Sequence, residues 1–263
     1  MEMVMETMTL SMLHIPLSWV LILYAGAFAV SCTGWRRTLL LLLAFALVSN
    51  ALIVLYRYSQ AWPMLPMHLA PVLTPCLLVS MLLLRSAVYL SAEPLKRRVE
   101  QLALLAIIIC LAAAQLFPKD FYLPFLRSDS LFAHIMLFAG AAGRVCFIFS
   151  LAWSITFFTA TVEERSLCMR RVLSWAAWGF VLWTLSMFSG EMWAYLGWGT
   201  PVIWHDPAIL LMMAVWFIYI ALLHLHFSRT WGLRARALFA AAGGCAALVL
   251  SLLADFGPFR PLW

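Results

Sequence analysis

The chain has 263 residues, of which 65% are hydrophobic and only 11% are charged, and its mean hydropathy is +0.98. A soluble domain carries about 25% charged residues, so this composition excludes a soluble globular protein and indicates an integral membrane protein. The net charge of +6 does not indicate a nucleic-acid partner, because the basic residues sort by membrane side. The six cysteines lack CxxC spacing and form no redox motif or zinc site.

The apolar runs are long enough to cross a bilayer as helices, and eight of them fit the sequence. The short alternating segments of a closed barrel do not occur. Proline, glycine or charged residues mark each boundary. We therefore predict an all-α polytopic membrane bundle of about eight transmembrane helices, forming one domain over residues 1–263. The predicted helices are 16–33, 38–56, 67–91, 99–117, 130–160, 170–188, 208–227 and 236–254.

The distribution of Lys and Arg predicts the orientation of the bundle. Twelve basic residues lie at one side of the predicted helices and four at the other, which places the first side in the cytoplasm and both termini outside the cell inner (plasma) membrane. The acidic first residues lack a basic region, so no cleavable signal peptide is expected. The cytoplasmic set is Arg36, Arg37, Arg85, Lys96, Arg97, Arg98, Arg165, Arg170, Arg171, Arg229, Arg234 and Arg236, and the external set is Arg57, Lys119, Arg127 and Arg260.

Two polar residues stand out in the long helix predicted over 130–160. His134 lies at the start of this helix. A neutral imidazole at the N-terminal end of a helix is a suitable axial ligand for haem iron. The other interpretation is a histidine that forms hydrogen bonds at the membrane interface. Arg144 is the one basic residue well within a predicted span. A guanidinium there needs a carboxylate, a group of carbonyls or a ligand propionate, and Glu191 and Asp255 are candidate partners.

The segment from Gly190 to Pro207 carries three tryptophans, a histidine and an Asp-Pro pair between two long apolar runs. We predict that this segment is a loop between two membrane helices, in which the rings offer a platform for a flat, apolar, anionic ligand such as haem; a general interfacial belt of tryptophan is the alternative. The Asp-Pro pair can cap the following helix instead of binding a ligand. The candidate platform residues are Trp193, Trp198, Trp204, His205 and Asp206.

His224 lies late in the seventh predicted helix, seventeen residues after Pro207 and so about 25 Å inward at the usual helical rise. It shares a helix face with Trp216 and Ile220, whereas His226 faces away. Ionisable residues within a span usually point into the bundle. Because histidines at opposite depths cannot bind one metal ion, His134 and His224 predict two separate sites.

Together these segments resemble the CcsA/ResC family of System II cytochrome c synthetases, with HemX-like and, more distantly, CcmC haem-handling proteins as relatives. The resemblance covers about 124–257. Pro124-Phe-Leu-Arg-Ser128 followed by His134 is similar to the family segment that supplies an external haem ligand. The run from Gly190 resembles the family's "WWD" haem platform. Ile218-Tyr-Ile-Ala-Leu-Leu-His224 resembles the segment whose histidine binds haem within the membrane.

The sequence departs from the family pattern in the platform. His205 is inserted between Trp204 and Asp206, and Val202 stands where the family has its middle tryptophan. The Lys-Glu pair that follows the family's proline is replaced by Ala208-Ile209.

The family's last external histidine ligand has no counterpart after Gly257. The external site therefore keeps His134 from the family set. His205, His68 or His14 could supply a second ligand, with His205 preferred because it already lies in the platform. Five-coordinate iron and a haem-free site are the alternatives.

The resemblance implies a haem-handling membrane protein for cytochrome c maturation. Haem b would meet His224 within the membrane, move outward, and bind the platform with His134 on its iron for attachment to apocytochrome c. The resemblance also implies a CcsB-like membrane partner, and whether the chain is a subunit of a cytochrome c haem lyase stays open. A non-catalytic HemX-like or scaffolding subunit is the alternative function. An unrelated transporter is the third, with Arg144 as its one mid-membrane charge.

Overall fold

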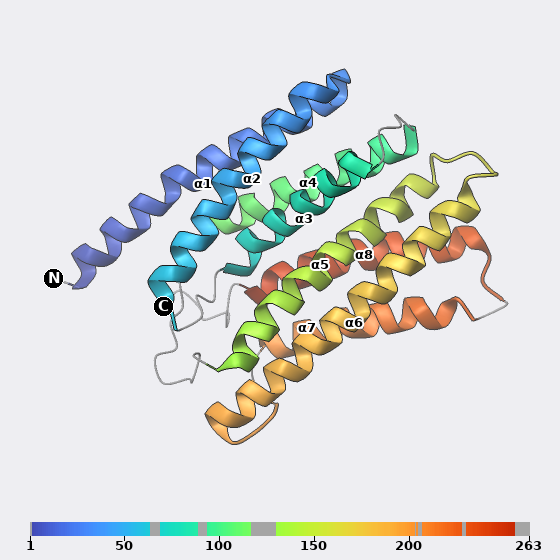
Figure 1. The fold of residues 1–263 in the computed structure, drawn as a ribbon. Coiled ribbons are helices and arrows are strands. Elements are labelled where there is room, and N and C mark those ends of the chain that lie inside the picture. The colour runs from blue at the N-terminus through green and yellow to red at the C-terminus, as the bar shows by residue number, and fades with distance from the viewer. Residues whose placement is uncertain are drawn as a thin grey trace.

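The computed structural model describes residues 2–63, 69–88, 94–116, 130–202, 204, 207–227 and 230–255, with the backbone alone at 2–15, 61, 85–88, 198, 207–208 and 254–255. Within these residues the chain forms eight α-helices and no strand. The helices alternate in direction, so α1 begins at the same end of the bundle at which α8 finishes (Figure 1). They are α1 (Glu2–Thr33), α2 (Arg36–Ala61), α3 (Ala70–Val88), α4 (Pro94–Leu116), α5 (Leu131–Phe157), α6 (Arg165–Trp198), α7 (Pro207–Leu225) and α8 (Leu233–Asp255).

Six of the described helices are long and apolar enough to cross a membrane, namely α1, α2, α4, α5, α6 and α8. The other two carry shorter apolar stretches, Ala70–Leu84 in α3 and Ile209–Leu225 in α7. The predicted all-α polytopic membrane bundle is therefore confirmed. Which end of the bundle faces the cytoplasm stays a prediction.

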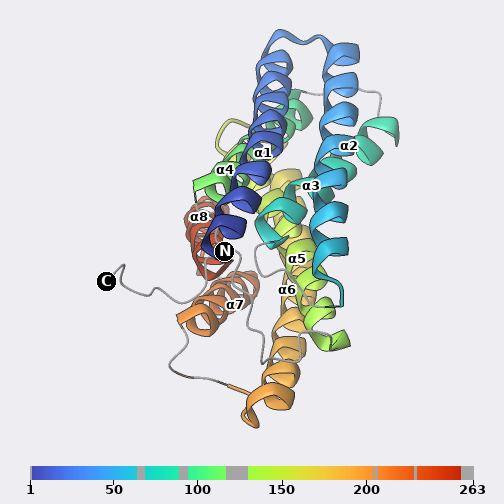
Figure 2. The ribbon, with the colours of Figure 1, turned by 90° about the vertical axis from the view of Figure 1, so that its left-hand side faces the viewer.

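Helices that follow one another in the chain pack as antiparallel pairs: α1 with α2, α3 with α4, α5 with α6, and α7 with α8 (Figure 1). The central helix is α5, which contacts α3, α4, α6 and α8. Its span is 78% buried, as expected for a helix that is apolar around its whole circumference. Figure 2 shows the same arrangement from the side, with α1 and α2 reaching the top of the view and the end of α6 at the bottom.

The two ends of the bundle differ in charge. Helices α2, α4, α6 and α8 begin at one end, and basic residues lie in their first turns at Arg36, Arg97, Arg165 and Arg234. We call this the basic end. We call the other end, where α3, α5 and α7 begin, the distal end.

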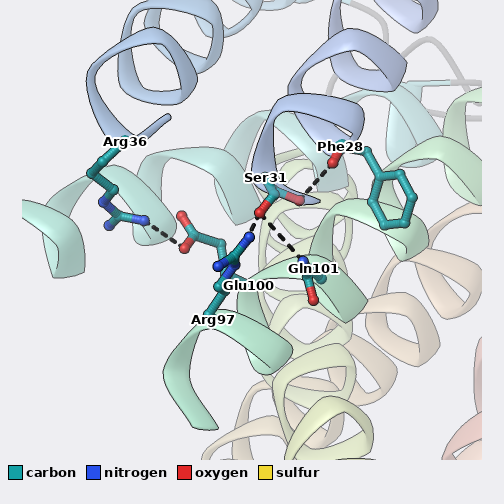
Figure 3. A network of polar contacts seen from close by, with 6 residues as sticks. All are labelled: Phe28, Ser31, Arg36, Arg97, Glu100 and Gln101. Atoms are coloured by element: carbon teal, nitrogen blue, oxygen red, sulfur yellow. Dashed lines mark hydrogen bonds and ion pairs between the residues drawn. The ribbon is translucent and has the colours of Figure 1, made fainter. Parts of the chain in front are cut away.

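A polar network at the basic end ties α4 to the turn between α1 and α2 (Figure 3). Arg97 donates from Nε to the Ser31 carbonyl at 3.0 Å and from Nη2 to the Cys32 carbonyl at 2.6 Å. These bonds satisfy carbonyls that the last turn of a helix leaves without an intrahelical partner. Arg36 donates from Nη1 to Glu100 Oε2 at 2.6 Å, and only 11% of the Glu100 side chain is exposed.

Glycine allows α5 and α6 to approach closely. A Cβ atom on Gly143 would lie 3.1 Å from the backbone nitrogen of Trp183 and 3.2 Å from the Gly179 carbonyl oxygen. Ser186 on α6 donates to the Met136 carbonyl on α5 at 2.7 Å. Small residues are the usual means by which membrane helices bring their backbones together.

The prediction that a loop begins at Gly190 is wrong. Helix α6 continues ten residues beyond the predicted limit and finishes at Trp198, where Gly199 adopts a left-handed conformation with φ of 74°. Gly190 is a packing residue, because a Cβ there would lie 2.9 Å from Met136 Sδ. The helix ends at Gly199 and not at Gly190, because a glycine with positive φ is the usual C-terminal signal of a helix.

Candidate functional site

His134 lies in the first turn of α5 at the distal end. Ser130 caps this helix by accepting a hydrogen bond from the Phe132 amide at 3.3 Å. The half-buried imidazole shares a hydrogen bond of 2.9 Å between its Nδ1 and the Tyr58 hydroxyl, which comes from the last turn of α2. Trp62, at the end of α2, packs on the same imidazole with ring centroids 5.4 Å apart.

The hydrogen bond to Tyr58 selects which nitrogen of His134 is left for a ligand. A histidine that binds a metal through Nε2 usually holds its Nδ1 in a hydrogen bond, which fixes both tautomer and ring orientation. Tyr58 also meets the imidazole edge-on, with ring centroids 5.7 Å apart and planes inclined by 70°. The geometry therefore suits coordination of iron through Nε2.

His134 does not share a helix face with the tryptophans of α6. Met136 contacts the position of Gly190 on α6, and His134 is two residues earlier, about 200° around the helix at 3.6 residues per turn. Its hydrogen bond and ring contacts lie toward α2. Helix α5 thus stands between the imidazole and α6, which carries Trp193.

The candidate platform residues fall in different environments. Trp193 lies on α6 and is buried, whereas Trp204 follows α6 and is 63% exposed. Trp198 is the last residue of α6, and its side chain is outside the described atoms. His205 and Asp206 lie outside the described residues, as does His68, and the side chain of His14 is also not described.

Arg144 lies in the core of the bundle with 4% of its surface exposed. It donates from Nη2 to the Ser251 carbonyl of α8 at 3.2 Å and from Nη1 to the Thr74 hydroxyl of α3 at 3.5 Å. A carbonyl partner is one of the three predicted kinds. Asp255, a predicted partner, is one turn beyond Ser251 on α8, and its side chain is outside the described atoms.

His224 lies in the last turn of α7, at the basic end, as the sequence predicts. Its Nδ1 hydrogen-bonds to the Ile220 carbonyl at 2.8 Å, and the side chain is exposed on the surface of the bundle, so the expectation that His224 points into the bundle is wrong. His134 and His224 therefore lie at opposite ends of the molecule. Helix α7 begins at Pro207, which confirms the predicted start.

Among the residues that the structure describes, no group of three or more His, Cys, Asp and Glu side chains gathers around one point. A bare zinc ion needs such a group. Haem iron needs only one or two axial side chains from the protein, which the arrangement at His134 can supply.

Tyr58 and Trp62 were missed from the sequence. The second helix was predicted to end at residue 56, which left both aromatic residues in a connecting segment, whereas α2 continues to Ala61. Their four-residue spacing is the signal that was available, because residues at i and i+4 share a helix face.

The fold and this site define a polytopic helical membrane protein with a histidine held among aromatic side chains at one end. Residues 4–258 match the family of the cytochrome C assembly protein, and the chain belongs to that family. The match includes the first four helices, where the sequence motifs are faint. This membership supports a role in cytochrome c biogenesis.

The curated relatives include the cytochrome c biogenesis protein CcsA of Prochlorococcus marinus. The protein of strain MIT 9515 is 39% identical and that of strain AS9601 is 37% identical, each over 99 residues that cover 38% of this chain and 30% of the relative. The protein of strain MIT 9303 is 45% identical over 65 residues, which cover 25% of this chain and 20% of the relative. No solved structure matches the chain.

Proposed function

We propose that this protein holds haem b at the distal end of the bundle during cytochrome c assembly, with His134 as an axial ligand of the iron. The observation that carries the proposal is the 2.9 Å hydrogen bond between His134 Nδ1 and the Tyr58 hydroxyl. That bond orients the imidazole and leaves Nε2 to coordinate. Trp62 supports the same orientation by packing against the ring.

Because α5 separates His134 from Trp193 on α6, the part of the tryptophan segment that follows α6 is proposed to pack against the porphyrin. Trp204 is 63% exposed, so it can stack on a bound ring, whereas buried Trp193 supports the end of α6 from within. His205 is proposed as the second axial ligand, and Asp206 as the cap of α7. Arg144 is proposed to stabilise this end of the bundle electrostatically through α3 and α8.

His224 is proposed to be the first residue of the protein that binds haem. Its side chain is exposed on the surface of α7, so haem in the bilayer or a neighbouring protein can reach it without opening the bundle. The sequence bias of Lys and Arg supports a cytoplasmic basic end and an external distal end in the inner membrane. Apocytochrome c and a CcsB-like membrane protein are the proposed partners at the external end.

The proposed part of the protein in the reaction is to bind, orient and present haem. Held in one orientation, the porphyrin edge can meet the cysteine thiols of an apocytochrome in a fixed geometry. The axial ligands set the properties of the iron.

Haem titration of the purified protein tests the proposal. We expect a Soret band on loading, a large loss of that band in His134→Ala, and its partial return when free imidazole is added. His226→Ala is the matched control, since this exposed histidine follows α7, and its spectrum should equal that of the wild type. A wild-type protein that takes up no haem, or a His134→Ala spectrum that is unchanged, contradicts the proposal.

A deletion strain separates this function from the scaffolding alternative. Loss of c-type cytochromes that is restored by the wild-type gene and not by His134→Ala supports haem handling. Retention of c-type cytochromes together with loss of another membrane complex supports the scaffolding subunit.

A further inference from the structure

Helix α6 has one exposed face that follows most of its length. The residues of this face recur at intervals of three or four, which places them on one side of a helix. They are Arg171, Ser174, Trp178, Val181, Leu185 and Phe188, and all six are exposed. Trp183 and Ser186, which donate hydrogen bonds to α7 and α5, belong to the side of α6 that packs within the bundle.

Most of this face is apolar. Its four apolar side chains, from Trp178 to Phe188, are between 49% and 64% exposed, and they lie within the candidate membrane span Arg165–Gly197. Because lipid acyl chains are as apolar as leucine, this face suits contact with lipid. The ten residues from Trp178 to Phe188 extend about 15 Å along the helix, which is half of a hydrocarbon core of about 30 Å. The apolar part of the face therefore matches the depth of one leaflet.

Two adjacent arginines lie where this face reaches the basic end. Arg170 and Arg171 are both exposed. Within the part of the chain that the structure describes, the one salt bridge joins Arg36 to Glu100, so no carboxylate there neutralises either guanidinium of the pair. Other arginines of the basic end bind protein groups instead, namely Arg36, Arg97, Arg98 and Arg165. The arginine pair of α6 is therefore available to an anion from outside the protein.

The groups at this end of the face match a phosphate that carries an apolar tail. A guanidinium binds phosphate oxygens through paired hydrogen bonds, and the Ser174 hydroxyl, one turn further along α6, is another donor. Trp178 follows one turn beyond Ser174, and tryptophan is typical of the depth at which headgroups meet acyl chains. Two adjacent positive charges disfavour the ammonium group of a zwitterionic headgroup, so the pair favours a headgroup with a net negative charge.

We propose that Arg170 and Arg171 bind the headgroup of one anionic phospholipid, whose acyl chain lies along the exposed face of α6. Ser174 and Trp178 complete the headgroup site. Charge complementarity at one end of the face and apolar contact along the rest select this occupant. The site is separate from His134 at the distal end and does not depend on haem binding.

Native mass spectrometry of the purified protein with added lipid tests the proposal. The two probes are anionic phosphatidylglycerol and zwitterionic phosphatidylcholine with identical acyl chains. We expect the wild-type protein to bind the first phosphatidylglycerol molecule about 10- to 30-fold more tightly than phosphatidylcholine, the effect of two basic residues near a membrane surface.

The double variant Arg170→Gln, Arg171→Gln should lose this preference, whereas Arg170→Lys, Arg171→Lys should keep part of it because the charges remain. Arg37→Gln is the matched control. Arg37 is also an exposed arginine of the basic end, so its variant should keep the wild-type preference if the site is specific to α6.

A photoreactive side chain identifies the occupant of the face in the membrane. Benzoylphenylalanine in place of Trp178, with both arginines retained, should form an adduct with a phospholipid on irradiation. An adduct with another polypeptide would overturn the proposal, because a protein would then cover the face. Equal affinities of the wild-type protein for the two lipids, or an equal loss of preference in Arg37→Gln, would also overturn it. The wild-type comparison and the adduct decide the outcome even where the double variant fails to fold.

Discussion

The Tyr58 hydroxyl and His134 Nδ1 lie 2.9 Å apart and join the end of α2 to the start of α5, across 76 residues of sequence. Neither residue is fully buried. Tyr58 packs against Trp62 and Phe138, and His134 packs against Trp62. The hydrogen bond holds the imidazole at a defined angle to α2. Any ligand on Nε2 therefore depends on the position of α2 as well as on α5.

Tyr58→Phe tests this relationship, because it keeps the ring and removes only the hydroxyl. We expect haem affinity to fall by about 10- to 100-fold, the usual effect of losing a group that orients a ligating histidine, together with a changed iron midpoint potential. The measurements are haem titration and redox titration of the purified protein. Tyr56→Phe is the control, since Tyr56 is 61% exposed on the same helix.

The outcomes of this pair of variants are distinct. Normal haem binding by Tyr58→Phe, together with loss in His134→Ala, rejects the role of the hydroxyl and keeps the ligand. Normal binding by both variants places haem elsewhere in the protein.

Gly143→Ala should destabilise the bundle by about 1–3 kcal/mol, as overpacking commonly does. The new Cβ would meet the backbone of Trp183 and Gly179 at 3.1–3.2 Å, and backbone atoms cannot move aside as a flexible side chain can. Thermal unfolding in detergent measures the change. Gly26→Ala is the control, because a Cβ there has no neighbour within 4 Å. Equal melting temperatures for the two variants would show that the close contact of α5 and α6 at Gly143 does not contribute to stability.

The number of helices and most of their bounds were predictable from the sequence, because long apolar runs, and the residues that interrupt them, determine membrane helices. All eight helices occur within a few residues of prediction except at the start of α1, which begins at Glu2 where residue 16 was predicted, and at the end of α6. Gly190 was interpreted as a breaker, but whether a glycine ends a helix or packs against a neighbour depends on tertiary contacts, here with Met136. Sequence patterns within one segment carry no information about such contacts.

The candidate site was predictable only in part for the same reason. His134 was identified from its own segment, and its place at the start of α5 is as predicted. Its partner Tyr58 lies 76 residues earlier, and no spacing rule connects the two. We also predicted that His134 lies beside the tryptophans of α6, and that prediction was based only on the order of the segments in the sequence. The structure shows α5 between them, because Met136 occupies the face toward α6.

Arg36→Ala should destabilise the turn between α1 and α2 by about 1–2 kcal/mol. The carboxylate of Glu100, 11% exposed, would lose its partner, and an uncompensated, partly buried charge costs more than an exposed one. Glu100→Gln should cost less, since it removes the charge that needs compensation. Arg37→Ala, at the neighbouring exposed position, is the control. Thermal unfolding compares the three variants, and a larger effect from Arg37→Ala than from Arg36→Ala would rule out the ion pair as the cause.

We predict that the turn between α5 and α6 becomes less stable at low pH, because of Glu164. The Thr161 hydroxyl donates to Glu164 Oε2 at 2.8 Å and the Thr161 amide donates at 3.0 Å, and these bonds lower the pKa of Glu164, with the charge of Arg98 as a smaller cause. Because the folded-state pKa is below that of the unfolded chain, the stabilising contribution is complete above the unfolded value and is lost as the pH falls through the folded one.

Thr161→Val should raise the pKa of Glu164 toward its ordinary value, because the larger of the two hydrogen-bond effects comes from the hydroxyl. The carboxyl ¹³C signal, assigned by its absence in Glu164→Gln, reports the titration directly, and the signal of Glu163 is the internal control. The turn in Thr161→Val should then loosen at a higher pH than in the wild-type protein, as measured by proteolysis between α5 and α6. An unchanged Glu164 titration in Thr161→Val would mean that the amide and Arg98 alone hold the carboxylate.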